Sequence, residues 1–219
     1  MHALKHPIDA QTSGGSRRGE RGYTLVALLA MMTILAIAML AAVPSVRHQA
    51  QREREIEAIR RGEEVAEAIR LYVRYHPQHA LPTSMEQLVE GVQVPGRTKK
   101  LQVLRAAAAH DPLSKSGEWR LIRFDEKAMI DFKSSVTLYG GGRLPLTSDP
   151  FIQLYASRIP ALRVVLDLDE AEPAPCGEND TANPKAQFIG VASRNTCSSI
   201  ITYYGIERYD QWIFTPLFR

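Results

Sequence analysis

Hydrophobic and polar positions divide the chain into an apolar run, an amphipathic segment and a longer mixed region. From Tyr23 to Val46 the sequence contains no charged residue over 24 positions. As a helix, with about 1.5 Å of rise per residue, this run would measure roughly 36 Å, which exceeds the bilayer core of about 30 Å. The pattern predicts a transmembrane helix at residues 23–46.

The polar segment that follows keeps helical spacing. Residues 47–76 carry charges on one face and an apolar stripe on the other, made of Ile56, Ile59, Val65, Ala66, Ile69, Tyr72 and Val73. Opposite charges stand three or four positions apart in three pairs, worth about 0.3 kcal/mol each: Glu57 with Arg61, Arg60 with Glu64, and Glu67 with Arg70. Because Pro77 cannot continue a helix, we expect an amphipathic continuation that ends near His76.

Residues 77–219 predict a small α+β domain. We expect a helix over 81–91, capped by Thr83 with Glu86 reaching back, and a helix or turn over 99–113. Strands are expected at 118–124, 162–168 and 187–193, with a hairpin about Gly205. Regular patterning is weak over 132–187, where 138–150 and the acidic stretch after Leu168 are typical of loops.

Composition excludes several classes of function. The net charge of the 219 residues is +3, and Lys and Arg are not clustered with aromatic residues, so no nucleic-acid partner is expected. Two cysteines are too few for a four-cysteine zinc site. The first 22 residues are rich in Gly, Ser and basic residues and are typical of a disordered leader.

The residues alone leave three interpretations of the apolar run. A secretory signal peptide would have a shorter apolar core and a small-residue cleavage site after it, which "MLAAVPS" supplies. An uncleaved signal anchor would keep its leader. The third interpretation places the cut before the run, at Gly22. Basic residues before the run favour a cytoplasmic N-terminus, although Arg47, Arg52 and Arg54 after it weaken that argument.

The third interpretation comes from a resemblance. A basic leader, Gly22 and then "YTLVALLAMMTILAIAMLAAVP" resembles the N-terminus of type IV pilins and type II secretion pseudopilins. In that family a membrane peptidase cleaves after the glycine and methylates the new N-terminal residue, here Tyr23. Thr24 and Leu25 fit the second and third mature positions, and Pro44 lies where many members carry a proline that bends the helix.

The resemblance continues beyond the membrane segment. "EIEAIRRGEEVAEAIRLYVRYHP…LPTSMEQLVEG" is similar to the helix and following segment of a bacterial pseudopilin subfamily, and "GVAS", "SIITYYG" and "YDQWIF" are similar to its C-terminal end. It covers about the first 130 residues and the last 32, with a divergent insertion at about 132–187.

This resemblance implies a fold and a role. The fold would be an α+β pilin-like lollipop, in which a long N-terminal helix packs on a small antiparallel sheet domain. The parts would be a cytoplasmic leader (1–22), an assembly helix (23–46), its amphipathic continuation (47–76) and a periplasmic domain (77–219). The chain would be a non-enzymatic subunit of a short periplasmic filament, held in the bacterial inner membrane before assembly. Its partners would be the prepilin peptidase, other pseudopilin subunits and the inner-membrane assembly platform.

Two further expectations follow from the resemblance. The fifth mature position is usually Glu but here is Ala27, so the chain lacks the carboxylate that faces a neighbour's N-terminal amine, which suggests a minor, tip-proximal or initiating subunit. A periplasmic domain also implies a Cys176–Cys197 disulfide, because thiols oxidise in that compartment. The alternative function is a membrane-anchored periplasmic binding or regulatory domain that does not polymerise.

Sequence motifs for catalysis or metal binding are lacking. The chain contains no GxGxxG, P-loop, HExxH, GxSxG or CxxC motif, and we expect no enzyme. His76 and His79 flank Pro77 and do not share a helical face, so they predict surface histidines rather than a metal pair. Asp111 beside His110 is more simply a turn than an acid–base pair.

Two other groups have a structural and a functional interpretation. One acidic set offers the oxygen ligands that Ca²⁺ prefers, and major pseudopilins bind calcium in a C-terminal loop: Asp167, Asp169, Glu170, Glu172, Glu178 and Asp180. Its spacing does not match an EF-hand, so a solvated acidic loop is favoured. The aromatic set predicts core packing rather than a ligand platform: Tyr203, Tyr204, Tyr209, Trp212 and Phe214.

Overall fold

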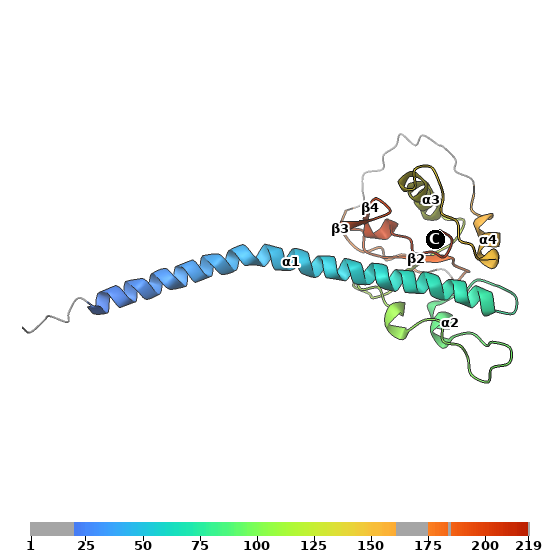
Figure 1. Ribbon diagram of the computed structural model, residues 1–219, viewed down its shortest axis with the longest axis horizontal. Coiled ribbons are helices and arrows are strands. Elements are labelled where there is room, and N and C mark those ends of the chain that lie inside the picture. Colours follow the sequence, from blue (N-terminus) through green and yellow to red (C-terminus); the bar gives the residue numbers. More distant parts are fainter. Residues whose placement is uncertain (1–19, 161–174, 184, 219) are drawn as a thin grey trace, which may run out of the picture. The chain divides into compact units, whose positions relative to one another are not determined.

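The computed structural model describes residues 20–160, 175–183 and 185–218, with the side chains of the first helix described over 23–39 and from 47 onward (Figure 1). The chain forms two compact units, Met1–Arg47 and His48–Arg219. Helix α1, Glu20–Tyr75, begins in the first unit and ends in the second. The predicted helix over 23–76 is therefore found, beginning three residues earlier.

In the first unit, the described side chains of α1 are exposed on all sides of the helix. Each described side chain from Tyr23 to Met39 is accessible, and the backbone stays helical through Pro44. Pro44 lies among residues 40–46, whose side chains are outside the description, and the bend expected there stays a prediction.

In the second unit, one stripe of α1 is buried. It runs through Glu55, Ala58, Val65, Ile69 and Val73, which follow one another at helical spacing. Ile56 was expected on this stripe but is 51% exposed. The reason is its position: one residue after Glu55 is a turn of about 100° around the helix, which carries the side chain off the buried face.

The second unit surrounds this part of α1 with short elements (Figure 1). In Figure 1, α2 lies on one side of α1, and α3, β3 and β4 lie on the other. The elements after α1 are α2 (Met85–Glu90), η1 (Ala106–Ala109), β1 (Arg120–Ile122), α3 (Lys127–Tyr139), α4 (Pro150–Ala156), β2 (Gly190–Ala192), β3 (Ser198–Tyr203), β4 (Ile206–Arg208) and η2 (Tyr209–Gln211).

The strands form two small antiparallel sheets. In the first, β1 pairs with β2, with Leu121 opposite Val191. In the second, β3 and β4 form the hairpin expected about Gly205. Tyr204 and Gly205 both have positive φ, 51° and 76°, the backbone conformation of a tight two-residue hairpin turn. The predicted α+β class is confirmed.

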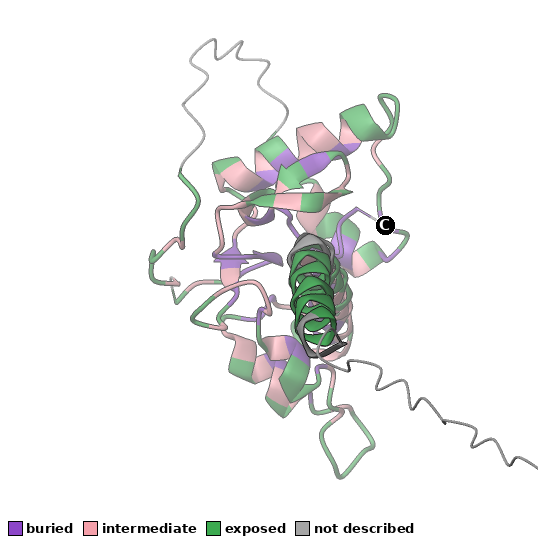
Figure 2. Ribbon diagram, turned by 90° about the vertical axis from the view of Figure 1, so that its left-hand side faces the viewer, coloured by how far each residue is buried: buried purple, intermediate pink, exposed green. Residues whose placement is uncertain are grey.

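The core fills the space between α1, the sheets and the C-terminal segment. Its largest fully buried side chains include Trp119, Trp212, Phe188 and Phe214. Figure 2 looks along α1, whose near turns are green because their described side chains are exposed, while the purple buried residues that can be seen lie on the elements around it. Of the aromatic set, Tyr209, Trp212 and Phe214 are buried. Tyr203 and Tyr204 are partly buried and pack against the core.

Three local predictions were wrong, and one lies outside the structure. The N-cap of α2 is Ser84 rather than Thr83, and Gln87 rather than Glu86 reaches back, accepting from the Thr83 N–H at 2.9 Å. Residues 138–150 are not all loop, because α3 continues to Tyr139. Helices α3 and α4 were not predicted; α4 and the second half of α3 lie in the segment 132–187, where patterning is weak. The strand predicted at 162–168 lies outside the described residues.

Candidate functional site

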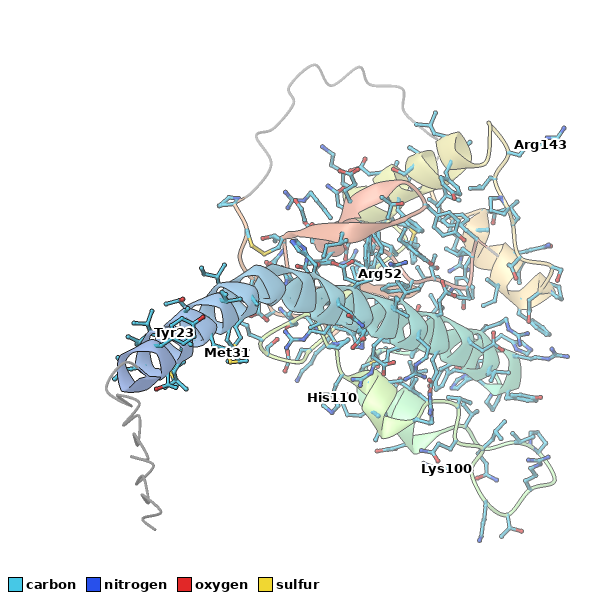
Figure 3. The ribbon with its side chains drawn as sticks, turned by 60° about the vertical axis from the view of Figure 1, so that its left-hand side comes forward. Tyr23, Met31, Arg52, Lys100, His110 and Arg143 are labelled. Carbon is cyan, nitrogen blue, oxygen red and sulfur yellow. A yellow bond between two sulfur atoms is a disulfide. The ribbon has the colours of Figure 1, made fainter. Side chains whose placement is uncertain are left out.

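The apolar part of α1 is the first candidate site, because it is a surface without cover. Tyr23 is 79% exposed and Met31 74% exposed, and both project from the helix in Figure 3. The remaining side chains to Met39 are accessible too, including Ala27. A helix that is apolar around its whole circumference is stable when lipid or other protein surrounds it.

The residues of the expected cleavage site lie together on this helix. Gly22 and Tyr23 are inside α1, followed by Thr24, Leu25 and Ala27. The local sequence favours a helix here, because Leu, Ala and Met are good helix formers and no glycine follows Gly22 until Gly62. Within the described residues, no helix reaches the length and apolarity that crossing a membrane requires. The span expected at 23–46 includes side chains outside that description and stays a prediction.

A buried carboxylate joins the second half of α1 to the C-terminal hairpin. Glu55 is 0% exposed, and its two carboxylate oxygens accept hydrogen bonds from the backbone N–H groups of Ile200 and Ile201, each at 2.9 Å. The Tyr209 hydroxyl also donates to Glu55, and Gln51 Nε2 donates at 3.1 Å. Burial, followed by the bond to Glu55, raises the pKa of Tyr209. The carboxylate thus receives four donors and fixes β3 against the helix.

Sequence patterning did not identify Glu55 as a contact residue, since it stands in a run of charges. Its position along the helix could have indicated burial, because Glu55 lies at helical spacing from Ala58 and Val65 on the apolar stripe.

A glycine allows the closest approach of α1 to the core. A Cβ on Gly62 would lie 2.2 Å from the Phe214 ring. Phe214 is itself buried and pairs with β2 through Val191, with backbone N···O distances of 2.8 and 3.0 Å. The C-terminal segment therefore packs on α1 where the helix has no side chain.

Charged pairs cover the exposed face of the same stretch. The three predicted pairs are found: Glu57–Arg61 at 2.7 Å, Arg60–Glu64 at 3.4 Å, and Glu67–Arg70. The two neighbouring arginines lower the pKa of Glu57 to about 2.

Cys176 and Cys197 are joined by a disulfide, with Cα atoms 4.2 Å apart. It closes the segment 175–183 onto the start of β3. Glu178 holds the same segment to residues 114–116. Its carboxylate accepts hydrogen bonds from the Ser114 hydroxyl and from the Ser116 N–H, the latter at 3.1 Å. These bonds, the serine hydroxyl first, lower the pKa of Glu178 to about 2.

The histidine and aspartate candidates have structural partners. The Nδ1 atom of His79 lies 2.9 Å from the Val73 carbonyl, and its ring stacks on Phe151 at 3.9 Å. Asp111 is buried and accepts from the Ser193 hydroxyl at 2.7 Å and the Leu113 N–H at 2.9 Å, as expected for a turn. Burial raises the pKa of Asp111, and these bonds partly oppose the rise.

The acidic set that was weighed as calcium ligands, with a solvated loop favoured, is only partly described. Asp167, Asp169, Glu170 and Glu172 lie outside the described residues. In the part of the chain that is described, no three His, Cys, Asp or Glu side chains are grouped to hold a metal ion.

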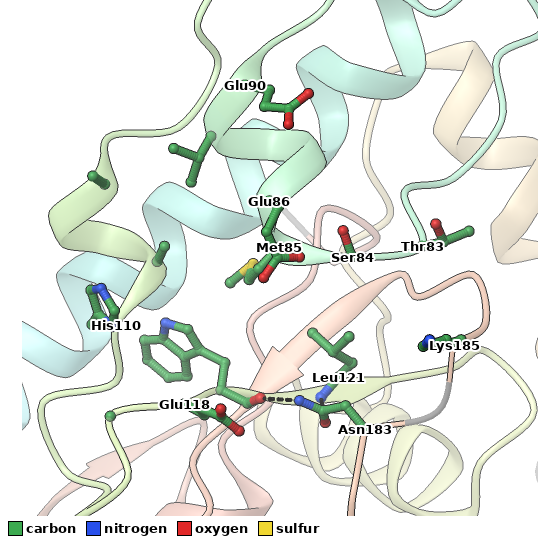
Figure 4. A pocket seen from close by; sticks show the side chains of 15 residues that line it. Thr83, Ser84, Met85, Glu86, Glu90, His110, Glu118, Leu121, Asn183 and Lys185 are labelled. Carbon is green, nitrogen blue, oxygen red and sulfur yellow. Dashed lines mark hydrogen bonds between the residues drawn. The ribbon is translucent and has the colours of Figure 1, made fainter.

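The second unit has a cavity of about 690 Å³ between α2, η1 and β1 (Figure 4). Apolar side chains line it, among them Met85 and Val89 of α2, Leu121 of β1 and Trp119, which directly precedes β1. Glu86, Glu90 and Glu118 also line it. A volume of this size is typical of ligand or peptide sites.

Comparison with protein-family models, curated proteins and solved structures found no match to this chain. The candidate sites consequently rest on their own geometry and on the sequence.

Proposed function

We propose that this chain is a pilin-like subunit that assembles, through α1, into a short filament of a type II secretion or type IV pilus-like machine. The observation that carries the proposal is the uncovered apolar surface from Tyr23 to Met39, on the same helix as the anchored amphipathic half. In this proposal the membrane covers that surface before assembly and neighbouring helices cover it afterwards. Both surroundings are apolar, so the transfer does not expose the segment to water.

The second half of α1 supports the proposal because it is firmly attached to the globular unit. A filament subunit that is pulled by its helix must carry its globular domain with it. The Glu55 contacts with the hairpin and the close packing of Gly62 on Phe214 supply that attachment. They are consistent with a pilin-like lollipop, which we include in the proposal.

Two features support a periplasmic location of the globular unit and a role as a minor subunit. A Cys176–Cys197 disulfide supports a periplasmic domain, because disulfides persist in oxidising compartments. Ala27 has no charge with which to meet a neighbour's N-terminal amine, which supports a minor or tip subunit. The prepilin peptidase, other pilin-like subunits and the inner-membrane platform are the partners in this scheme.

Cross-linking in the membrane tests assembly. Ile34→Cys places a thiol on the apolar surface, and Leu154→Cys places one on the globular unit at similar exposure, 68% against 64%. The native cysteines are paired and do not compete. Co-expressed with the partner subunits, Ile34→Cys should form covalent adducts between subunits after mild oxidation, and Leu154→Cys should not. Retention in the membrane with equal, background cross-linking of both variants would instead support the anchored, non-polymerising domain, for which the 690 Å³ cavity offers a binding site.

A further inference from the structure

The arginines of α1 differ in their partners along the helix. Those in the middle of its second half pair with glutamates three or four positions away, as Arg60 does with Glu57 at 2.7 Å. Nearer the apolar half, Arg47, Arg52 and Arg54 are exposed, and no ion pair found among the described residues includes them. We call these three the arginine group. Their cations are left for a partner outside the chain.

The carboxylates closest to the arginine group in sequence do not neutralise it. Glu55 is buried and accepts from the backbone of β3, and Glu57 is held by the two arginines one turn further on. Glu53 is exposed. At about 100° per residue it lies nearly opposite the buried stripe of α1, whereas Arg52 and Arg54 lie on either side of that stripe. With three arginines against the carboxylate of Glu53, the group keeps a positive charge.

Apolar side chains are exposed at the same end of the second unit. Ile56 on α1 is 51% exposed, and Ile200 on β3 is 44% exposed. Because the Ile200 N–H donates to Glu55 at 2.9 Å, Ile200 lies beside the turn of α1 that carries Arg52, which Figure 3 labels, and Ile56. Exposed aliphatic side chains next to basic ones are typical of surfaces at the boundary between lipid headgroups and acyl chains.

The arginine group directly follows the apolar run of the same helix. Residues 23–46 carry no charge, and α1 continues to Tyr75. At about 1.5 Å of rise per residue, Arg47 to Arg54 cover roughly 10 Å, comparable with a headgroup layer of about 5–8 Å on each side of a bilayer. With the apolar run in a membrane, these arginines meet lipid phosphates, which a guanidinium binds through two parallel hydrogen bonds.

We propose that Arg47, Arg52 and Arg54 bind the phosphate groups of anionic lipids at the surface of the membrane that holds the chain before assembly. The inference rests on the proposed membrane anchoring of α1 and adds a lipid preference to it. The bound lipids fix the depth of the helix in the membrane. They also oppose its extraction into a filament, because these contacts break when the subunit leaves the bilayer.

The test measures the lipid selectivity of the full chain in phosphatidylcholine vesicles by electron paramagnetic resonance. Spin-labelled phosphatidylglycerol or phosphatidylcholine is added in trace amounts, and the fraction of each that the protein immobilises gives the ratio of their association constants. The triple variant Arg47→Gln, Arg52→Gln and Arg54→Gln should lower this ratio about threefold. An arginine near the membrane surface attracts an anionic lipid about fivefold, and unselective lipids around the rest of the helix dilute the average.

Two control variants separate charge from structure and from position. The same three changes to lysine keep the charge and should keep most of the selectivity. Arg74→Gln removes an exposed arginine that has no ion pair among the described residues and lies at the other end of α1, so it should leave the ratio unchanged. The leader also carries lysine and arginine, so the difference between variants is decisive rather than the wild-type ratio.

Each other outcome overturns the inference in a distinct way. Equal ratios for the wild-type chain and the triple glutamine variant would refute lipid binding and leave membrane anchoring intact. Absence of immobilised lipid of either kind would refute both, because the chain then does not enter the bilayer. An unchanged ratio together with loss of the Ile34→Cys cross-links in the triple variant would assign the arginines to carboxylates of neighbouring subunits instead.

Discussion

The buried carboxylate of Glu55 gives the most direct prediction about how the globular unit is held to α1. In Glu55→Ala the partly buried backbone N–H groups of Ile200 and Ile201 lose their acceptor, and so does the buried Tyr209 hydroxyl. Gln51 keeps its hydrogen bond to the Tyr209 hydroxyl at 2.9 Å. Each buried donor left without a partner costs about 1–3 kcal/mol, and the removal of a buried charge recovers part of that. We expect a net loss of about 3 kcal/mol in the free energy of unfolding of the second unit.

Two further variants separate the hydrogen bonds from other effects. Glu55→Gln keeps the shape and one carbonyl acceptor, but its amide N–H₂ faces donors, so the expected loss is smaller, about 1–2 kcal/mol. Glu53→Ala removes an exposed carboxylate two residues away and should change stability by less than about 0.5 kcal/mol.

The assay is urea unfolding of the full chain in detergent, followed by tryptophan fluorescence. The sequence has two tryptophans, Trp119 and Trp212, and both are buried in the second unit, so the signal reports that unit. A lower urea midpoint with an unchanged slope would match the expected loss of stability. The reasoning is refuted if Glu55→Ala unfolds at the same urea concentration as Glu53→Ala.

Four other predictions concern packing, pH, redox state and assembly. Gly62→Ala should lower stability by about 1–3 kcal/mol in the same assay, because the new methyl group overlaps the Phe214 ring; an unchanged midpoint would contradict this. Glu178 has a pKa lowered from 4.5 to about 2, so its contribution is present above about pH 4.5 and is lost as the pH falls towards 2; Glu178→Gln should reduce the fall in urea midpoint over that range, and an identical fall would argue against it. Cys197→Ser should cost roughly 3 kcal/mol on the loop-entropy estimate, with non-reducing alkylation confirming which wild-type thiols are blocked; wild-type stability in the variant would refute it. Expressed as the sole pilin-like subunit, the wild-type chain should form no long filaments in electron micrographs, and Ala27→Glu should restore some; long wild-type filaments would refute the minor-subunit proposal.

The elements that sequence predicts best are those set by local periodicity. The helix ending at Tyr75 and the hairpin at Gly205 follow from a proline stop and a turn that needs positive φ. Helix α3 had a signal that was overlooked, since Met129, Phe132 and Val136 stand at helical spacing and are its buried residues.

Other features depend on contacts between distant parts of the chain. Asp149 caps α4 by accepting from the Phe151 N–H at 3.0 Å, a local signal, but the helix has only seven residues and too short a pattern to detect. The exchange of hydrogen bonds between Asn183 and β1 joins residues 62 to 64 positions apart. Periodicity carries no information on such pairs, so they appear only when the chain is folded.

The mature N-terminus tests the proposed function most directly. The chain is expressed in a bacterium that contains a prepilin peptidase, and the intact mass and N-terminal peptide of the membrane-extracted protein are measured. Gly22→Val should block processing, and Gly19→Val, in the same leader, should not. The account predicts a chain that begins at Tyr23 and carries one added methyl group on its amine. A wild-type protein that keeps residues 1–22, or that begins after Ala42, would contradict it.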